Sequence, residues 1–385
     1  MLGANELVDI TSAHIDGVLF HGPAGVAFVE KLAQNGAQVK VPTTTNVGAL
    51  NLLKPDQCHL SDADKKLAFR QMLAHEKMGC RPSWTCAPYQ AGARPALGAQ
   101  IAWGESNAVA FANSALGART NRYGDFLDIA CAVSGRAPHC GLHVTENRAA
   151  GHIFDASGLP DDLVRSDIFL PLLGAFVGAT TGAEVPAIVG IDPEVSEDGL
   201  KSLFAGAAAK GSVGLCHVVG VTPEAPDLAT ALQNRSTPRE TKVTKDMLWQ
   251  MYQTLNPTNA EHIDCVALGS PHFSVAECHQ LLNLASGTPF KKRLLICTGR
   301  HVTDQLKDDG TYAALSALGA EFIVDTCIAV TPILKESSGV MMTNSAKFAH
   351  YSVGTTGHQP IFASLRDCVL SAQSGRKISD ESLWR

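Results

Sequence analysis

The chain contains 385 residues, of which 45% are hydrophobic and 18% are charged, and it carries a formal net charge of −6 at pH 7. This length supports more than one folded core, and this composition excludes a long disordered tail. The negative charge and the lack of a basic cluster argue against nucleic-acid binding, and no apolar stretch is long enough to span a membrane. We therefore expect a cytoplasmic protein that acts on a small molecule.

The first elements predict a strand, helix, strand opening. Residues 7–11 form an expected strand, residues 24–34 a helix, and residues 38–41 a second strand. A further helix should run from the N-cap Ser61 to the C-cap Gly79. Its expected apolar stripe consists of Ala63, Leu67, Ala74 and Met78.

Between residues 80 and 148, Gly, Pro, Asn, Arg and aromatic residues crowd together without a sustained period. Long irregular stretches inside compact domains are usually functional. A change of pattern at residues 151–162 suggests a boundary, so we expect an N-terminal α/β region at 1–155 and a C-terminal α/β region at 156–385.

In the C-terminal region, a Gly- and Ala-rich segment at 170–182 and an expected helix at 245–255 precede a regular alternation of strands and helices. The strands are expected at 263–268, 294–297 and 322–324, with helices starting near 274 and 303. This alternation predicts an α/β fold with a parallel sheet flanked by helices, in which ligands bind at the carboxyl ends of the strands, between domains.

Two of these strands are followed by cysteines, Cys297 and Cys327, and a third is followed by Ser270. Carboxyl ends of parallel strands share one sheet edge, so the two thiols, with Cys86 from a distant loop, are candidate metal ligands. The sequence contains eleven cysteines but no Cys-x-x-Cys pair, so a metal site must be assembled from distant segments. An isolated buried cysteine is more often a small hydrophobe, and that reading stays open for Cys86 and applies more strongly to the eight cysteines outside this set.

Polar residues in apolar surroundings provide the other candidates. Glu105 and Ser106 would be costly to bury unless they bind something, and Arg119 with Arg122 could clamp an anionic group. An internal hydrogen-bond network is the alternative. Lys347 follows small polar residues that favour a helix start, where an anion can bind, although a solvated surface lysine is the usual case. No dinucleotide fingerprint or Walker A sequence occurs, so we predict neither NAD nor ATP.

Several longer motifs together resemble one family over nearly the whole chain. They are residues 12–17 (SAHIDG), 41–46 (VPTTTN), 84–89 (WTCAPY), 103–109 (WGESNAV), 117–125 (GARTNRYGD), 271–274 (PHFS), 325–327 (DTC) and 343–351 (TNSAKFAHY). In these motifs the chain resembles the large subunit of aconitase X, a divergent branch of the aconitase superfamily.

The resemblance implies a hydro-lyase with an iron–sulfur cluster held by three cysteines, whose iron acts as a Lewis acid. Two of these cysteines correspond to Cys86 and Cys327. Archaeal relatives have the third directly before the Pro-His pair, where this chain has Ser270. Cys297 is our replacement candidate, and Cys265, inside its strand, is a weaker one. Of the possible clusters we favour 2Fe-2S over 3Fe-4S or 4Fe-4S.

The resemblance also assigns a catalytic and a substrate-binding set. The implied catalytic residues are Glu105, Ser106 and Lys347. The implied substrate contacts are Gly17, Val18, Leu19, Asn46 and Val47, to which we add Arg119. Archaeal members dehydrate 5-phosphomevalonate and bacterial members cis-3-hydroxy-L-proline. The missing cysteine, and a valine where archaeal relatives have proline, favour the bacterial type, which gives a pyrroline-2-carboxylate.

The family also has a small swivelling domain, fused or on a separate small subunit that carries a serine thought to be the base. This chain lacks that domain, so we expect a heterodimer that is active only with the small subunit. Relatives usually begin with an extra helix, which leaves open that the amino terminus is incomplete. A 5-phosphomevalonate dehydratase large subunit is the enzyme alternative, and a cluster-free binding or regulatory subunit is the alternative of a different class.

Overall fold

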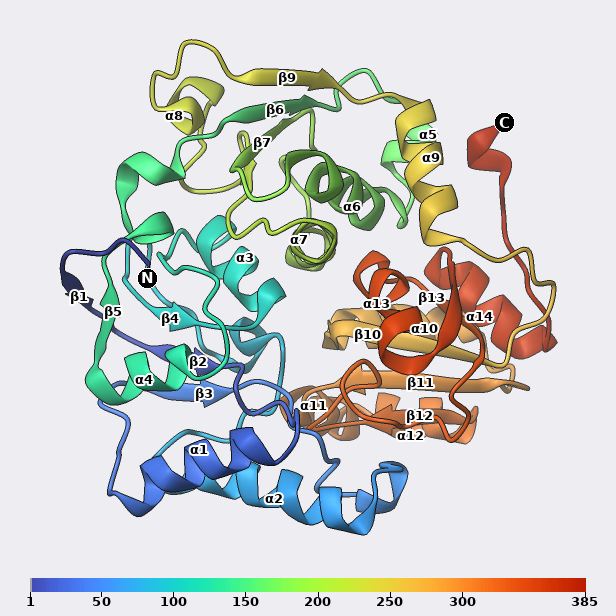
Figure 1. The fold of residues 1–385 in the computed structure, drawn as a ribbon. Helices are drawn as coiled ribbons and strands as arrows, with labels where there is room; N and C mark the ends of the chain where they lie inside the picture. Colours follow the sequence, from blue (N-terminus) through green and yellow to red (C-terminus); the bar gives the residue numbers. More distant parts are fainter. Residues whose placement is uncertain (1) are drawn as a thin grey trace.

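Parallel sheets form the framework of the computed structural model, which describes residues 2–385 (Figure 1). Within these residues the sheet orders are β3-β2-β4, β8-β7-β6-β9 and β12-β11-β10-β13-β14, and β1 pairs with β5 in an antiparallel ribbon. The strands are β1 (Leu7–Asp9), β2 (Ala13–Ile15), β3 (Thr43–Thr45), β4 (Ala102–Trp103), β5 (Arg136–Pro138), β6 (His152–Asp155), β7 (Pro186–Val189), β8 (His217–Val218), β9 (Arg239–Lys242), β10 (Cys265–Phe273), β11 (Arg293–Thr298), β12 (Ala320–Ile323), β13 (Gly339–Thr343) and β14 (His358–Phe362). The expected α/β class with parallel sheets flanked by helices is confirmed.

Many helices begin where the sequence places a Ser or Thr whose side chain accepts a hydrogen bond from a backbone N–H three residues later, which stabilises a helix start. Ser61, Ser274 and Ser345 act in this way. The α-helices are α1 (Pro23–Gln34), α2 (Asp62–Lys77), α3 (Ser106–Ser114), α4 (Leu127–Ser134), α5 (Asp161–Val164), α6 (Phe169–Thr181), α7 (Glu197–Lys210), α8 (Leu228–Leu232), α9 (Lys245–Leu255), α10 (Val275–Ala285), α11 (Arg300–Asp308), α12 (Thr311–Ala317), α13 (Ala346–Thr356) and α14 (Leu365–Ser374).

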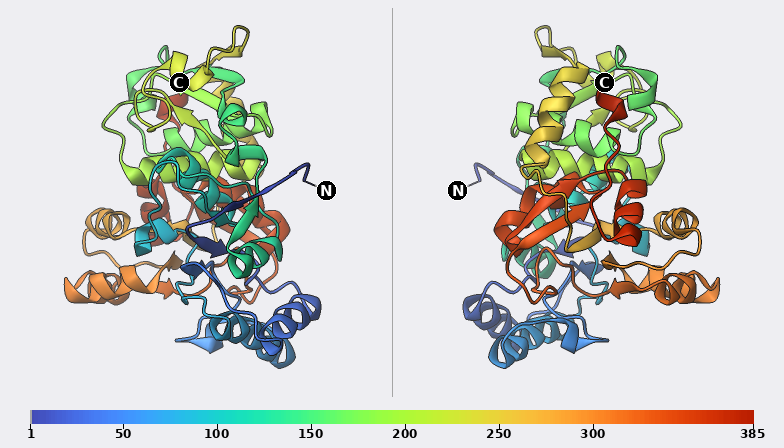
Figure 2. Two further views of the ribbon diagram at one scale, coloured as in Figure 1. Left: turned by 90° about the vertical axis from the view of Figure 1, so that its left-hand side faces the viewer. Right: turned by 90° about the vertical axis from the view of Figure 1, so that its right-hand side faces the viewer.

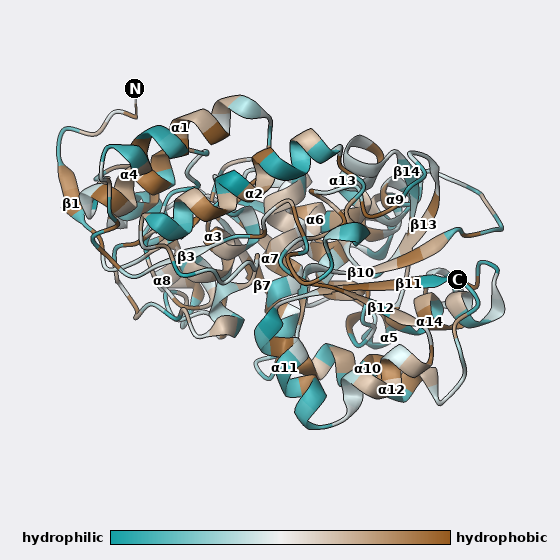
Figure 3. Cartoon of the chain, turned by 90° about the horizontal axis from the view of Figure 1, so that it is seen from below, coloured by the Kyte–Doolittle hydropathy of each residue, from teal (hydrophilic) through white to brown (hydrophobic). Residues whose placement is uncertain are grey.

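The N-terminal sheet differs from its prediction in two places. The strand expected at 38–41 is wrong, because the paired residues are Thr43–Thr45, after Pro42. The stripe expected on α2 is wrong at Ala63, which is exposed, because the buried face is centred on the second half of the helix. Figure 3 shows alternating hydrophilic and hydrophobic stretches along α1 and α2, as a helix with one buried face requires.

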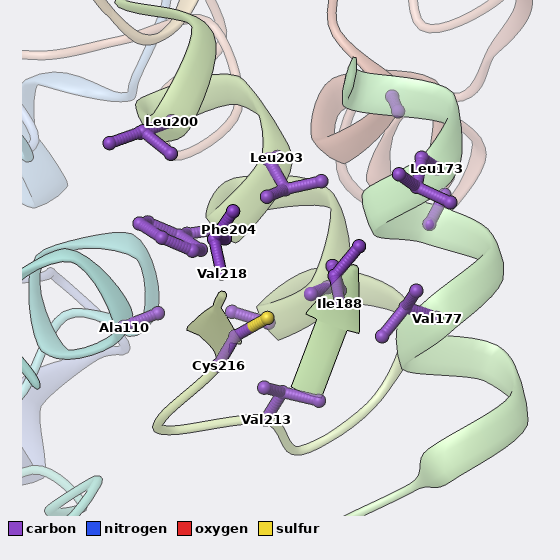
Figure 4. Close-up of a cluster of buried hydrophobic side chains, with 14 of the residues drawn as sticks. Ala110, Leu173, Val177, Ile188, Leu200, Leu203, Phe204, Val213, Cys216 and Val218 are labelled. Atoms are coloured by element: carbon purple, nitrogen blue, oxygen red, sulfur yellow. The ribbon is translucent and has the colours of Figure 1, made fainter. Parts of the chain in front are cut away.

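The sheet β8-β7-β6-β9, the middle sheet in chain order, packs against α6 and α7. The core between them is hydrophobic, and Figure 4 shows Cys216 in it, surrounded by side chains such as Val213 and Val218. This cysteine is a small hydrophobe. Strand β6 lies inside the region expected at 1–155 but pairs with β7 and β9 of this sheet. The expected division into 1–155 and 156–385 stays a prediction.

The five-stranded sheet follows the predicted alternation of strands and helices, with one correction. The strand expected at 263–268 continues to Phe273, and its register to β11 shifts between Leu268 and Phe273. Ser270 therefore lies within the irregular part of β10, Cys297 is the second-last residue of β11, and Cys327 lies in the loop after β12. The three positions share a sheet edge but are not equivalent strand ends.

The termini lie apart. In Figure 2 the N-terminal segment projects from the side of the molecule, whereas the C terminus lies beside the middle sheet. There Lys245 at the start of α9 donates a hydrogen bond to the carbonyl of Arg385. None of the helices in residues 2–385 is long and apolar enough to cross a membrane.

Candidate functional site

A cavity of about 1460 Å³ opens where the ends of strands from two sheets face each other. Its lining includes residues that directly follow β2, β3 and β4 on one side and the β10 and β12 ends on the other. Among the predicted site residues, the lining contains Leu19, Asn46, Val47, Cys86, Glu105, Ser106, Cys327 and Lys347. The cavity therefore collects residues from segments that are more than 300 positions apart.

An ion pair between Glu105 and Lys347 spans the cavity wall. The Lys347 Nζ donates to the Glu105 Oε1 at 2.5 Å and to the Ser106 Oγ at 3.3 Å. Glu105 is the N-cap of α3 and accepts a bond from the Ala108 N–H through Oε2, while Lys347 is in the first turn of α13. The pair thus joins the first turns of two helices from opposite parts of the chain.

Both partners are buried, and each keeps the other charged. Burial alone would raise the pKa of Glu105, but the Lys347 charge and hydrogen bond outweigh it, so the pKa lies below its usual value. Burial would lower the pKa of Lys347, and Glu105 instead raises it above its usual value. At neutral pH the cavity therefore contains a fixed ammonium with Ser106 beside it.

A second polar group follows β2. The Asn46 Nδ2 donates to the Asp16 Oδ1 at 2.5 Å, and both residues line the cavity. Behind them, the Asp128 Oδ2 accepts bonds from the backbone N–H groups of Asp16 at 2.6 Å and Gly17 at 3.1 Å. Burial, and then the carboxylates of Glu105, Asp125 and Asp128, raise the pKa of Asp16 to about 8.

The three predicted metal ligands lie near one another, since the pKa of each thiol is raised in part by another of the set. Cys86 and Cys327 line the cavity, and Cys297 is fully buried next to them. Burial first, and then charges that include a neighbouring thiolate of the set, raise the pKa of each thiol to about 12. Each sulfur also faces backbone N–H groups, from His272 at 3.2 Å for Cys86, and from the loop at 328–330 for the other two. Such donors stabilise thiolates once a metal replaces their protons.

These donors fit a cluster better than a single ion. Thiolates bound to one metal ion lie about 4 Å apart, and within residues 2–385 no three His, Cys, Asp or Glu side chains are close enough to hold one ion. In a cluster the thiolates are divided over more than one iron, so they need not all lie within reach of a single ion. Ser270 also lines the cavity, whereas Cys265, at the start of β10, does not.

Some of the other predicted residues do not reach the cavity. Gly17 and Val18 are buried directly behind Asp16 and are not among the lining residues. Arg119 is not brought to the cavity either, because its guanidinium donates to the Thr145 Oγ1 at 2.7 Å and lies 4.0 Å from Glu224. Its neighbour Arg122 does line the cavity.

Asp16 and Asp128 are site residues that sequence reasoning missed, whereas Arg122 was considered with Arg119 as an anion clamp but was not included in the predicted substrate contacts. For Asp16 a signal was present, since it follows the short apolar strand β2 directly, as Asn46 follows β3. Asp128 offered none, because it comes from α4, which is distant in sequence from β2.

Comparison with known proteins identifies the family of the chain. Models described as the aconitase X first, second and third domains match residues 1–146, 150–253 and 263–374. A crystal structure of Thermococcus kodakaraensis aconitase X (holo-form) superposes with a TM-score of 0.86 at 31% identity, covering 96% of this chain and 92% of that one. The chain belongs to the aconitase X family. The predicted resemblance and the aconitase-like fold are thereby confirmed.

Among its relatives in this aconitase X family are named enzymes. A cis-3-hydroxy-L-proline dehydratase from Pseudomonas aeruginosa is 41% identical over 99% of this chain, and one from Hypocrea jecorina is 40% identical over 97%. A phosphomevalonate dehydratase large subunit from Thermococcus kodakarensis is 34% identical over 91% of this chain and 86% of its own length. This chain spans 66% and 64% of the two hydroxyproline dehydratases, slightly less than two thirds of each.

Proposed function

We propose that this chain is the large part of a hydro-lyase that removes water from cis-3-hydroxy-L-proline and forms a pyrroline-2-carboxylate. The observation that carries the proposal is the single cavity in which the Glu105–Lys347 pair meets Cys86 and Cys327. An aconitase X dehydratase needs a site for an iron–sulfur cluster beside a charged group that orients the substrate. The higher identity to the two hydroxyproline dehydratases supports this substrate over 5-phosphomevalonate.

In this proposal Cys86, Cys297 and Cys327 hold an iron–sulfur cluster, with 2Fe-2S as the favoured type. When bound, the cluster supplies a Lewis acid that draws electrons from the departing hydroxyl. Convergence of the three thiols and the N–H groups facing their sulfurs support this set. Ser270 and Cys265 are the competing third ligands, and Ser270 is the nearer of the two to the cavity.

The protein's own residues would bind and orient the substrate. Lys347, kept charged by Glu105, would bind the substrate carboxylate, because a buried ammonium attracts an anion strongly in a water-poor site. The Ser106 Oγ lies within hydrogen-bond distance of both Lys347 and Glu105. It would hold the substrate carboxylate in one orientation. Holding the ring in one pose brings the carbon that loses its proton to the same place in each turnover.

The proposal includes a partner region and a cytoplasmic location. The relatives named phosphomevalonate dehydratase large subunit imply a small subunit, and the hydroxyproline dehydratases are longer than this chain. A small swivelling domain, fused or separate, would close the cavity and bring the base. All eleven cysteines lie unpaired among the described residues, which favours a reducing compartment.

The test is anaerobic purification of the chain together with its swivelling region, followed by iron and sulfide analysis, an absorption spectrum and assays on both substrates. We expect a coloured protein with iron and sulfide that consumes cis-3-hydroxy-L-proline. Cys297→Ala should lower the iron content, whereas Cys265→Ala, the matched control in a neighbouring strand, should not. Activity on 5-phosphomevalonate alone would reverse the substrate order. A colourless, iron-free complex without activity on either substrate would favour a binding or regulatory subunit.

A further inference from the structure

Asp16 lines the cavity among acidic neighbours and has no cationic partner in the part of the protein that the structure describes. Its carboxylate faces the cavity, and the nearby carboxylates are Glu105, Asp125 and Asp128. Lys347 is already paired with Glu105. No Lys, Arg or His in residues 2–385 lies within 4.0 Å of Asp16. The Asp16 carboxyl therefore has no cationic partner among these residues, although His21, Arg122 and Lys210 line other parts of the same cavity and His21 lies 3.7 Å from Asp125.

Hydrogen-bond acceptors are also left without donors there. The Asp16 Oδ1 accepts from Asn46, but its Oδ2 has no donor in the described part of the chain. The Oδ1 of Asn46, a residue that is only 2% exposed, has no donor either. A buried acceptor without a donor is costly, so such groups usually mark a ligand position. What is missing here is a donor of hydrogen bonds, and a cationic donor would also offset the neighbouring carboxylates.

The backbone fixes this carboxylate in place. A side chain at Gly104, at the end of β4, would put its Cβ 2.7 Å from the Asp16 Cβ and 3.0 Å from the Asp128 Oδ2. Only glycine allows β4 to come so close. The Asp128 carboxylate anchors the Asp16 N–H from the other side. Asp16 is therefore a rigid group, which suits recognition better than a mobile surface carboxylate does.

We propose that Asp16, together with Asn46, selects substrates that carry a positively charged nitrogen by binding that nitrogen opposite Lys347. This inference rests on the proposed function and deepens it. An amino acid with a ring ammonium places its two N–H bonds at Asp16 and Asn46 and its carboxylate at Lys347. A phosphorylated hydroxy acid has no positive group, so it leaves the Asp16 side of the cavity unmatched and is repelled by its carboxylates.

The neighbouring carboxylates add a measurable consequence. Since burial and then Glu105, Asp125 and Asp128 raise the pKa of Asp16 to about 8, its carboxyl holds a proton in the free protein at pH 7. A bound ammonium favours the ionised carboxylate and lowers this pKa. Binding at pH 7 should therefore release a proton from Asp16 to the solvent.

The experiment compares two unreactive probes of the same shape, L-proline and tetrahydrofuran-2-carboxylate, in which oxygen replaces the ring nitrogen. Their affinities for the assembled enzyme are measured by calorimetry at pH 7 in buffers of different ionisation enthalpy. We expect L-proline to bind at least about tenfold more tightly, a ratio that corresponds to about 1.4 kcal/mol. Only L-proline should release a proton.

Asp16→Asn should remove both the preference and the proton release. Asp308→Asn, an exposed aspartate at the end of α11, is the matched control and should keep both. Equal affinity of the two probes in the wild-type enzyme, or no binding of L-proline, would overturn the inference. So would a preference that survives in a folded Asp16→Asn variant. If that variant does not fold, the wild-type probe ratio and proton release decide alone.

The experiment distinguishes a failure of this inference from a failure of the proposed function. An enzyme that prefers L-proline but does not dehydrate cis-3-hydroxy-L-proline would contradict the proposed reaction and leave the recognition of a cationic nitrogen standing. An enzyme that dehydrates the hydroxyproline without any probe preference would contradict only the role of Asp16.

Discussion

The two walls of the cavity are both built from ends of parallel strands, yet they carry different chemistry. The wall after β2, β3 and β4 carries charged and amide groups, Asp16, Asn46 and Glu105. The wall formed by β10 and the loop after β12 carries Ser270 and Cys327, and Cys297 of β11 is buried outside the lining. The ends of parallel strands hold side chains in fixed positions in both walls. The residue type at each end then decides which kind of group can bind there.

The difference suggests separate tasks for the two walls of this cavity under the proposed function. The polar wall suits the charged ends of an organic substrate, and the sulfur wall suits iron. Lys347 connects the two, since it pairs with Glu105 on the polar wall and its charge lowers the pKa of Cys86 and Cys327. Substitutions on one wall should therefore leave the other intact, except at Lys347.

The largest effect is expected on the sulfur wall. Cys327→Ala should abolish dehydration and lower the iron content, because a cluster that loses a thiolate ligand is bound weakly or not at all. Iron analysis and the visible absorption spectrum of the assembled enzyme measure this. Cys140→Ala, a half-buried thiol away from the cavity, is the control and should keep its iron. Full iron content in Cys327→Ala would remove this residue from the ligand set, and the affinity for L-proline should not change.

Lys347→Met should affect both walls. Removing the ammonium leaves Glu105 as a buried charge without its partner, which costs about 3–5 kcal/mol of unfolding free energy. We expect kcat/KM to fall by about 100-fold or more, as for loss of a preorganised charged donor. The double variant Lys347→Met with Glu105→Gln should regain much of the stability but none of the activity. Denaturant unfolding and steady-state kinetics test both points.

Lys307→Met is the matched control, because Lys307 forms an exposed pair with Asp304 on α11 that contributes less than about 1 kcal/mol. Restored activity in the double variant would contradict a direct role of the ammonium in substrate binding.

The sequence predicted the strands of the sulfur wall better than those of the polar wall, for physical reasons. Long apolar runs such as those ending near Cys297 and Cys327 indicate buried strands clearly, and their shared sheet edge follows from parallel topology. The strands of the polar wall have only two or three residues, too few for a period, so the strand was expected at 38–41 instead of Thr43–Thr45.

Contacts between residues far apart in the sequence could not be predicted from local patterns, because such patterns report only on neighbouring residues. The contact of Glu105 with Lys347 joins residues 242 positions apart, and only the family resemblance brought both into one predicted set. The bond from the Asp16 N–H to Asp128 spans 112 positions and was not predicted. The irregular end of β10 was missed because Gly269 and Pro271 usually indicate a loop.

A smaller effect on the polar wall concerns pH. In the folded protein the pKa of Asp16 is raised to about 8 from an ordinary value of 3.8. The folded state therefore binds the proton more tightly than the unfolded state does, and its contribution to stability is complete below pH 3.8 and is lost as the pH rises through about 8. Asp16→Asn lacks this loss. From pH 6 to pH 9 the melting temperature of the wild type should fall relative to that of the variant.

The matched measurement is the same pH series on Asp308→Asn, which should follow the wild type. A difference of about 1 °C corresponds to roughly 1 kcal/mol in a chain of 385 residues. Parallel curves for the wild type and Asp16→Asn would show that the acidic neighbours do not act on this carboxyl, and would weaken the charge argument for the polar wall.

The smallest effect separates two neighbouring arginines. Arg119 was predicted to bind the substrate, but its guanidinium contacts Thr145 and lies near Glu224, whereas Arg122 lines the cavity. Arg119→Ala should leave KM within about twofold of the wild type, since its distant, partly exposed pair with Glu224 contributes at most about 1 kcal/mol. Arg122→Ala should raise KM by several-fold, because it removes a positive charge from the wall that faces an anionic group. The opposite order would mean that Arg119 reaches the substrate after the cavity closes, and the polar wall would then extend beyond the ends of β2, β3 and β4.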